Sequence, residues 1–494
     1  MNQGDTVTDQ YNQEHTIRSE LGKGGQGIVY TTNDPEIAIK LVLTKDGEPY
    51  KDKEYITSYH QLLDNLLTLP LSQGLNLARP ICKLKDHAGY VMQQLRDMKP
   101  VEDLLPIYPK NIEDIKYPQW LDGFIKGKRY KDAYTLVHYA QTGSTKRRFE
   151  ILMQCAAQLA KLHGQGLVYG DISNENVFFS ENKVFNHVWF IDADNLRFEN
   201  KISKKAVFTP GYGAPELVLG QVGASTNTDA YSFSVLAFKL LSLLHPFDGE
   251  KLLNGDDDGD WANEEDDTAS CLSIFEQAQA GLLPFIDDPD DDSNRNNSGL
   301  PRPLILTDTI INLFNNTFNK AQRNPWKRPL MFHWPKALAQ AVDASIECTS
   351  CNMSYLEKYA QSENKCPYCS AKAPRYLSIQ RFAINTLANP DTWRAVMSEL
   401  DSEICLPKRL FTPFELDDFD DEFARIHKET DHWELSLSFS YSEKINVALN
   451  KPGENFSPLV SKLELTEDEL KIGVLLQIAG DFPQQVTIML KGAQ

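Results

Sequence analysis

Short alternating runs of apolar and polar residues lie near the start of the chain. Residues 17–21 and 27–30 have this pattern on either side of a glycine-rich stretch, and residues 37–42 form a mostly apolar run. Alternation with a period of two is typical of half-buried strands, whereas a short continuous apolar run is typical of a buried strand. The pattern predicts a hairpin followed by a third, buried strand.

Two longer segments have the apolar periodicity of amphipathic helices. They cover about residues 51–67 and 149–163. Apolar positions that recur every three to four residues place one stripe of the helix against a core. Two further short apolar runs, at residues 89–92 and 188–191, predict strands that follow each helix along the chain.

The last 119 residues, 376–494, contain three more alternating segments. They lie at residues 433–441, 470–476 and 485–490 and predict strands of a small antiparallel β domain. No cluster of His, Cys or carboxylate residues accompanies them. An interaction module is therefore the favoured interpretation of this region, and a second active site is the alternative.

Length and composition limit the number of domains, the location and the partners that we expect. At 494 residues the chain is too long for one compact core, and its 41% hydrophobic and 24% charged residues describe an ordinary globular protein. No apolar run approaches the roughly 20 residues needed to cross a bilayer, and the polar start lacks the features of a signal peptide. We expect two or three domains, a cytoplasmic location and no membrane partner. The net charge of -19 argues against nucleic acid as a partner.

Most of the negative charge lies in one segment. Residues 248–293 contain sixteen Asp or Glu residues and one Lys. A solvated loop insertion is the simpler interpretation. A calcium-binding loop is the alternative, although Trp261 falls within it and no helix is evident before it. The residues that fit positions 1, 3, 5, 6 and 12 of such a loop are Asn254, Asp256, Asp258, Gly259 and Glu265.

The eight cysteines form two groups. Four are scattered singles that we interpret as buried or inert thiols: Cys82, Cys155, Cys271 and Cys405. The other four form two Cys-x-x-Cys pairs separated by 14 residues: Cys348, Cys351, Cys366 and Cys369. Two such pairs can place four thiolates around one tetrahedral Zn²⁺ ion, which would leave no open position for catalysis. Structural zinc is the favoured interpretation, and redox-active thiols or chance spacing are the alternatives.

Candidate chemistry comes from glycines and carboxylates in the first half of the chain. Gly22, Gly24 and Gly27 lie between the first two predicted strands, where a backbone without Cβ atoms can approach phosphate oxygens closely. Asp171 and Asn176 lie in a loop after the second helix, and Asp192 ends a predicted strand. Taken singly, an Asp at such a position is more often a turn or helix-cap residue.

Five motifs in one order change that interpretation, because together they resemble a protein kinase. They are the glycine turn, the lysine of Ile37-Ala38-Ile39-Lys40, the Asp171 and Asn176 pair, Asp192, and Ala214-Pro215-Glu216. The resemblance implies ATP and Mg²⁺ as cofactors. It also implies that Asp229 braces the catalytic loop and that Glu216 pairs with Arg328.

The resemblance also implies a role for each site residue. Gly22, Gly24, Gly27 and Lys40 would contact the phosphates, with Glu54 positioning Lys40. Asp171 would be the base, and Asn176 and Asp192 would hold Mg²⁺. Adenine would lie near the segment after residue 92, which resembles a kinase hinge. The nucleotide-contacting positions implied in addition are Val29, Ala38, Met92, Gln93 and Leu95.

Several positions depart from the family pattern. Tyr169-Gly170 replaces the usual His-Arg before the catalytic aspartate, so no arginine is present there to clamp a phosphorylated activation loop. Ser173 stands where a lysine is usual. Asp192-Ala193-Asp194 replaces Asp-Phe-Gly. We interpret Asp194 as a capping or solvent-exposed residue, with an added metal ligand as the alternative. Retained base and metal positions favour an enzyme whose control has moved to its partners or C-terminal modules.

Particular residue strings make the resemblance to protein kinases more specific. Tyr169-Gly170-Asp171-Ile172-Ser173, the Asp-rich insert and a Cys₄ knuckle directly after the kinase region resemble bacterial eukaryotic-type kinases of the tellurium-resistance-associated group. In that group the kinase is encoded with a PP2C-type phosphatase and a TerY-like von Willebrand A protein. The resemblance implies a protein substrate, with these two proteins as candidate partners.

The combined prediction is an α+β protein with a two-lobed kinase-like domain, a zinc knuckle and a β-rich module. The expected boundaries are 15–95 for the N-lobe, 96–342 for the C-lobe with its acidic insertion, 343–375 for the knuckle and 376–494 for the β-rich module. The predicted activity is ATP- and Mg²⁺-dependent transfer of phosphate to Ser or Thr of a protein. A nucleotide-binding pseudokinase that acts as a scaffold is the alternative.

Overall fold

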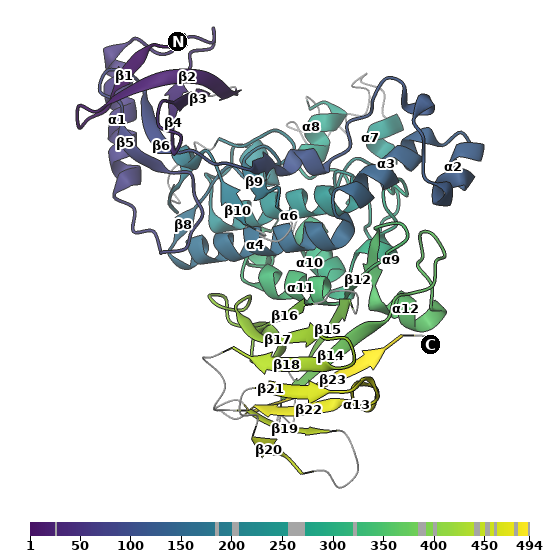
Figure 1. Cartoon of the computed structure of the whole chain (residues 1–494). Helices are drawn as coiled ribbons and strands as arrows, with labels where there is room; N and C mark the ends of the chain where they lie inside the picture. Colours follow the sequence, from purple (N-terminus) through teal and green to yellow (C-terminus); the bar gives the residue numbers. More distant parts are fainter. Residues whose placement is uncertain are drawn as a thin grey trace.

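The structure is a computed structural model, drawn in Figure 1. It describes residues 1–24, 27–182, 187–199, 207–254, 272–319, 324–383, 392–398, 403–438, 445–449, 455–458, 462–478 and 483–492. A strand-rich region lies at the top of Figure 1, a mostly helical region in the middle and a second strand-rich region at the bottom. These three regions follow the order of the sequence.

The first region is a six-stranded sheet with one helix. The strand order is β1-β2-β3-β4-β6-β5, and all pairs are antiparallel. The elements are β1 (Thr6–Thr8), β2 (Glu14–Lys23), β3 (Gly27–Thr32), β4 (Ile37–Val42), α1 (Lys53–Leu67), β5 (Pro80–Lys83) and β6 (Gly89–Gln93). The predicted hairpin, third strand and helix are confirmed. β1 is an addition, because a three-residue strand with one buried side chain gives little periodic signal.

The middle region contains the longest helices of the structure. The residues of α4 and α6 are almost all buried, which explains why they form the centre of a core rather than a surface stripe. Its helices are α2 (Asp122–Lys126), α3 (Tyr130–Gln141), α4 (Ser144–Gly164), α5 (Pro215–Val218), α6 (Thr226–Ser242), α7 (Glu250–Asn254), α8 (Ile274–Gln279), α9 (Arg302–Ile305), α10 (Asp308–Phe318) and α11 (His333–Asp343).

Short strands connect these helices at the boundary with the first region. They are β7 (Met98–Pro100), β8 (Leu167–Val168), β9 (Val177–Ser180), β10 (Val188–Phe190) and β11 (Arg197–Phe198). β9 lies between β10 and β7, and β11 pairs with β8. The loop between β8 and β9 and the turn after β10 carry the predicted catalytic residues. Most of the calcium-loop candidate, residues 255–265, and Cys271 lie outside the described residues.

The cysteine knuckle and the last strands continue the same core. The knuckle comprises β12 (Ser345–Glu347), β13 (Ser354–Leu356) and α12 (Glu357–Glu363). Two antiparallel sheets follow, in the orders β15-β14-β23-β22-β19-β20 and β16-β17-β18-β21. Their elements are β14 (Tyr376–Ala383), β15 (Trp393–Ser398), β16 (Glu403–Pro407), β17 (Glu422–Lys428), β18 (Trp433–Leu437), β19 (Ile445–Leu449), β20 (Ser457–Pro458), β21 (Lys462–Leu465), α13 (Glu467–Ile472), β22 (Val474–Ile478) and β23 (Gln484–Lys491).

The predicted antiparallel β region is thus present, with one local error. Residues 470–472 were expected to begin a strand but end helix α13. The cause is a capping box, in which the Thr466 hydroxyl accepts from the Glu469 N–H and the Glu469 carboxylate accepts from the Thr466 N–H. The predicted strand at 433–441 is described only as far as residue 438.

Among the described residues, no helix has both the length and the apolar character that crossing a membrane requires.

Candidate active site

The glycine turn joins β2 to β3, and its glycines differ in what they make possible. A Cβ atom at Gly27 would lie 2.7 Å from the Leu41 carbonyl oxygen and 3.2 Å from Cε of Lys40. Gly27 therefore cannot be replaced without moving β4, on which Lys40 lies. Added Cβ atoms at Gly22 and Gly24 would meet nothing within 4 Å, so no close contact requires glycine at these two described positions.

Lys40 lies in the middle of β4, and its side chain is buried. Its Nζ donates to Asp192 Oδ1 at 2.8 Å and to Asp194 Oδ2 at 2.9 Å. Burial opposes the charge on this ammonium, but Asp194 and Asp192 outweigh burial and raise the pKa of Lys40. The lysine is consequently a fixed cation beside the turn that follows β10.

Asp192 begins a single 3-10 turn, Ala193–Asn195, and has a left-handed backbone with φ 55° and ψ 49°. A residue with a Cβ atom is unusual in this region, and such strain is concentrated at functional sites. Its side chain remains about one-third exposed, at 32%. Asp192 can therefore turn toward a ligand.

The loop between β8 and β9 brings Asp171 and Asn176 together. The Asn176 side-chain amide donates to the Asp171 carbonyl oxygen at 2.9 Å, and the Asn176 carbonyl accepts from the Ile191 N–H at 3.0 Å. The second bond holds the loop against the residue that precedes Asp192. Four predicted positions, Lys40 included, thus meet between the first and middle regions.

Asp229, at the start of α6, holds the loop between β8 and β9 through two hydrogen bonds, as predicted. Its carboxylate accepts from the backbone N–H of Tyr169 at 2.7 Å and from that of Gly170 at 2.9 Å. Gly170 has φ 90°, a conformation that favours glycine. The predicted pair of Glu216 with Arg328 is also present and bidentate, at 2.6 and 2.8 Å.

Tyr169, which replaces the usual histidine, has a packing role. It is fully buried, lies 4.9 Å from the Phe190 ring and donates its hydroxyl to the Ile191 carbonyl. The loop is therefore braced by an aromatic residue without any charged group at that position.

The Asp171 carboxylate is held by a segment that follows β11. Thr209 donates to Asp171 Oδ1 twice, from its N–H at 2.9 Å and from its hydroxyl at 2.8 Å. Burial raises the pKa of Asp171, and the two bonds from Thr209 act in the opposite direction. A carboxyl with a raised pKa is a better proton acceptor at neutral pH than an exposed aspartate.

Glu54 does not reach Lys40 in this structure. It lies exposed in the first turn of α1, where the Asp52 side chain caps the helix, and the partners of Lys40 among the described residues are Asp192 and Asp194. Tyr59, five residues later, is on the opposite side of the helix because five residues correspond to about 500° of rotation. The buried residues of α1 are Tyr59, Leu63 and Leu66, and the expected pairing of Glu54 with Lys40 is not present.

The additional residues predicted to contact the nucleotide lie on β3, β4 and β6 or directly after β6. Ala38 is fully buried and pairs with Met92, and Ile37 pairs with Gln93. Beyond β6, the Gln94 N–H donates to the Glu36 carbonyl at 2.8 Å, and Gln93 is exposed while Leu95 is partly buried. Val29, on β3, is opposite Lys40. Val29, Ala38, Met92 and Gln93 thus lie on three adjacent strands of the sheet near Lys40, and Leu95 follows β6.

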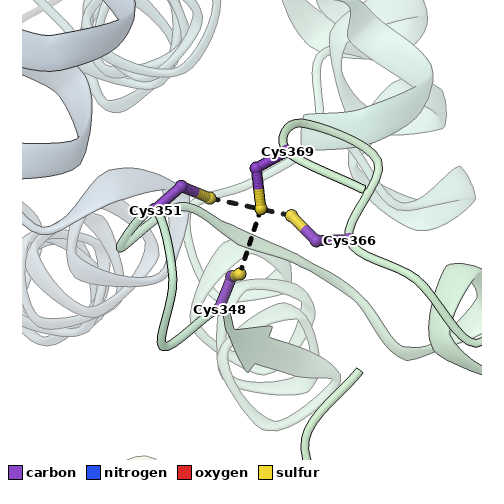
Figure 2. A group of neighbouring side chains, drawn as sticks. All are labelled: Cys348, Cys351, Cys366 and Cys369. Atoms are coloured by element: carbon purple, nitrogen blue, oxygen red, sulfur yellow. Dashed lines mark hydrogen bonds between the residues drawn. The ribbon is translucent and has the colours of Figure 1, made fainter. Parts of the chain in front are cut away.

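The four predicted zinc ligands form a compact cluster, shown in Figure 2. Their sulfur atoms all lie within 4.8 Å of one another, with 3.5 Å between Cys348 and Cys369 and 3.7 Å between Cys351 and Cys366. A disulfide would require about 2.05 Å. Four sulfurs at about 2.3 Å from one ion would be about 3.8 Å apart, so the cluster fits tetrahedral Zn²⁺.

The two halves of the knuckle have the same local geometry. Asn352 follows Cys351 with φ 58°, and Ser370 follows Cys369 with φ 61°. Their N–H groups donate to the carbonyls of Cys348 and Cys366, respectively, at 2.8 and 2.9 Å. The knuckle is fastened to the start of α4, where Ser354 exchanges hydrogen bonds with residues 144 and 146.

Comparison with known proteins agrees with this geometry. Residues 124–279 match the protein kinase domain family, a span that contains Asp171, Asn176 and Asp192 but not Lys40. A serine/threonine-protein kinase pkn2 of Myxococcus xanthus is 34% identical over 110 residues, which cover 21% of this chain and 13% of the relative. Residues 124–279 are thus similar to the protein kinase domain family, and these relatives are named as serine/threonine kinases.

Two longer matches are less similar. The serine/threonine-protein kinase PknD of Chlamydia felis is 24% identical over 257 residues, or 48% of this chain and 25% of the relative. The PknD of Protochlamydia amoebophila is 26% identical over 258 residues, or 47% and 23%. The matches therefore span a quarter or less of the length of these relatives.

Sequence reasoning missed one part of the site. Asp194 was interpreted as a capping or exposed residue, but its side chain is 14% exposed and bound to Lys40. Tyr59 and Tyr90 also donate to it, at 3.2 and 2.8 Å. The available signal was an acidic residue in place of the usual glycine, two positions after Asp192.

Proposed function

We propose that this protein is an ATP- and Mg²⁺-dependent kinase that phosphorylates Ser or Thr of a partner protein. The observation that carries the proposal is the 2.8 Å ion pair between Lys40 of β4 and Asp192 after β10, beside the loop that holds Asp171 and Asn176. A buried cation, metal-binding oxygens and a base are the groups that phosphoryl transfer requires in one place.

Each residue has a defined task in this reaction. Lys40 would hold the phosphates, and the oxygens of Asn176 and Asp192 would hold Mg²⁺, which neutralises charge on the phosphates when bound. Asp171 would orient the hydroxyl of the acceptor and take its proton as the oxygen bonds to the γ-phosphorus. ADP then leaves with the electrons of the broken bond.

The catalytic loop is of the type that lacks arginine before the aspartate. Tyr169 and Gly170 provide no cation for a phosphorylated activation segment. Thr209, which holds Asp171, lies in that segment. We therefore propose that partner proteins or the C-terminal modules control access to Asp171, in place of loop phosphorylation.

A pseudokinase scaffold is the second candidate. The observation that favours it is the pair of hydrogen bonds by which Thr209 occupies one oxygen of Asp171. If the segment stayed in that position with nucleotide bound, Asp171 could not take a proton through that oxygen. The protein would then bind ATP and act through its knuckle and β sheets.

One experiment separates the two candidates. Wild type and Asp171→Ala are incubated with γ-labelled ATP and Mg²⁺, with casein as a generic acceptor, while ATP affinity is measured in parallel by calorimetry. A kinase labels itself or the acceptor, and Asp171→Ala binds ATP without labelling. ATP binding without label from the wild type would support the scaffold.

We also propose that the cysteine cluster holds one structural Zn²⁺ ion. Four thiolates complete a tetrahedron, so no position remains for substrate or water. The knuckle joins α4 to the C-terminal sheets, and the ion would stabilise that junction. Because free thiolates persist in a reducing compartment, this proposal is consistent with the cytoplasm as the location of the protein.

The proposed partners follow from the resemblance described above. They are a von Willebrand A protein of the TerY type, as a candidate substrate, and a PP2C-type phosphatase that would reverse the reaction. Stress response associated with tellurium resistance is the proposed setting. Co-purification of the three proteins, followed by phosphosite mapping with and without active kinase, tests this proposal.

A further inference from the structure

We propose that Asp194 is the carboxylate that positions Lys40 for the nucleotide, a role that rests on the proposed kinase function. The Asp194 Oδ2 atom accepts from Lys40 Nζ at 2.9 Å. In the kinase pattern this role belongs to a glutamate on the helix after the lysine strand. Here the helix carries Glu54 on its exposed side, so the carboxylate comes from the turn after β10.

Both carboxylate oxygens of Asp194 accept hydrogen bonds from tyrosine hydroxyls. The hydroxyl of Tyr90, on β6, donates to Oδ1 at 2.8 Å, and the hydroxyl of Tyr59, on α1, donates to Oδ2 at 3.2 Å. Both phenols are buried. The Tyr90 bond has the usual length of an O–H···O hydrogen bond and the Tyr59 bond is longer, and together they hold the carboxylate from two different elements.

Asp192 and Asp194 therefore have different roles in the turn after β10. Asp194 is 14% exposed and has three hydrogen bonds, whereas Asp192 is 32% exposed and is bonded to Lys40 through one oxygen. A lysine ammonium has three N–H donors. Asp194 can keep one while Asp192 turns to a metal ion, which leaves donors of Lys40 for phosphate oxygens.

This arrangement changes how helix α1 is coupled to the site. A helix that supplies the carboxylate can switch the lysine on and off by moving. In this protein the helix supplies a phenol to Asp194, and the ion pair itself joins β4 to the turn after β10. The ion pair between Lys40 and Asp194 then persists when α1 moves. Movement of this helix therefore does not control the position of Lys40.

The test compares Asp194→Asn with wild type in a phosphoryl-transfer assay, with Asp64→Asn as the matched control. Asp64 is an exposed aspartate on α1 that pairs with Lys83, so the same chemical change occurs away from Lys40. Loss of the charge on residue 194 is expected to lower kcat/KM for ATP about 10- to 100-fold. KM for ATP should rise, while KM for the protein acceptor stays the same.

This split separates positioning from a merely structural role, because partial unfolding lowers the active fraction without changing KM for ATP. Asp194→Glu, which keeps a carboxylate, should recover part of the loss. If Asp194→Asn does not fold, Tyr90→Phe is measured in its place. It removes one hydrogen bond from Asp194 and is expected to raise KM for ATP about 3- to 10-fold.

Distinct outcomes overturn the inference and the proposed function. If the wild type transfers no phosphate, the kinase proposal fails, and the effect of Asp194→Asn on ATP affinity still measures the positioning of Lys40. If the wild type is active and the folded Asp194→Asn variant has an unchanged KM for ATP, the inference fails. It also fails if Glu54→Gln, and not Asp194→Asn, produces the rise in KM.

Discussion

Arg409 and Asp343 form a buried bidentate ion pair across the junction between the helical middle region and the C-terminal sheets. The Nε and one terminal nitrogen of Arg409 donate to the two Asp343 oxygens, each at 2.8 Å. Trp393 of β15 donates to the same carboxylate at 2.8 Å. Asp343 is the last residue of α11, so the C-terminal sheets are fastened directly to the helical region.

The first prediction concerns this junction. Arg409→Ala leaves the buried Asp343 carboxylate without its cation and is expected to lower the free energy of unfolding by about 3–5 kcal/mol. Denaturant unfolding measures the change. Arg425→Ala is the control, because its pairs with Glu403 and Glu422 are largely exposed and are expected to contribute less than about 1 kcal/mol. Equal effects of the two variants would contradict the proposed junction.

The second prediction concerns Asp229, which holds the proposed catalytic loop between β8 and β9. Asp229→Asn replaces one acceptor oxygen by an amide, so one of the buried N–H groups of Tyr169 and Gly170 loses its partner. We expect stability to fall by about 1–3 kcal/mol. We also expect kcat to fall about tenfold or more, since small displacements of catalytic groups are costly. Asp132→Asn, an exposed aspartate on α3, should change neither quantity.

The third prediction concerns the cysteine cluster. Wild type is expected to contain one zinc ion per chain by metal analysis, and Cys348→Ser to lose it. The melting temperature should fall by about 5 °C or more, because metal binding and folding are coupled at such sites. Cys405→Ser, an exposed thiol on β16, should retain the ion. Equal zinc contents in the two variants would remove the metal proposal.

The fourth prediction uses the raised pKa of Asp171. Because burial disfavours the ionised form only in the folded state, the penalty is fully present at neutral pH. It decreases as the pH falls through the raised pKa and vanishes below the unfolded-state pKa. Asp171→Asn should therefore melt at a higher temperature than wild type at neutral pH, with a difference that shrinks at lower pH. A lower melting temperature at neutral pH would contradict this explanation.

Strands and candidate site residues could be predicted from the sequence where the residue pattern is local. Lys40, Asp171 and Asn176 could be proposed as site residues because each lies in a short motif, and the strands around them have clear periodicity. The pairing of Lys40 with Asp194 was not predicted, because the two residues are 154 positions apart along the chain and the exposed side of α1, on which Glu54 lies, is set by helix rotation. The helix at residues 467–472 was missed because a capping box outweighed the apolar pattern of residues 470–476.

The central claim is that Lys40, Asp171 and Asp192 form a phosphoryl-transfer site. The most direct test is the rate of phosphate transfer from saturating Mg²⁺-ATP to protein Ser or Thr, measured for wild type and Asp171→Asn. The account predicts Mg²⁺-dependent transfer by wild type, with a loss of about 100-fold or more in the variant at similar ATP affinity. Equal rates in the two proteins, or no transfer by a wild type that binds ATP, would contradict it.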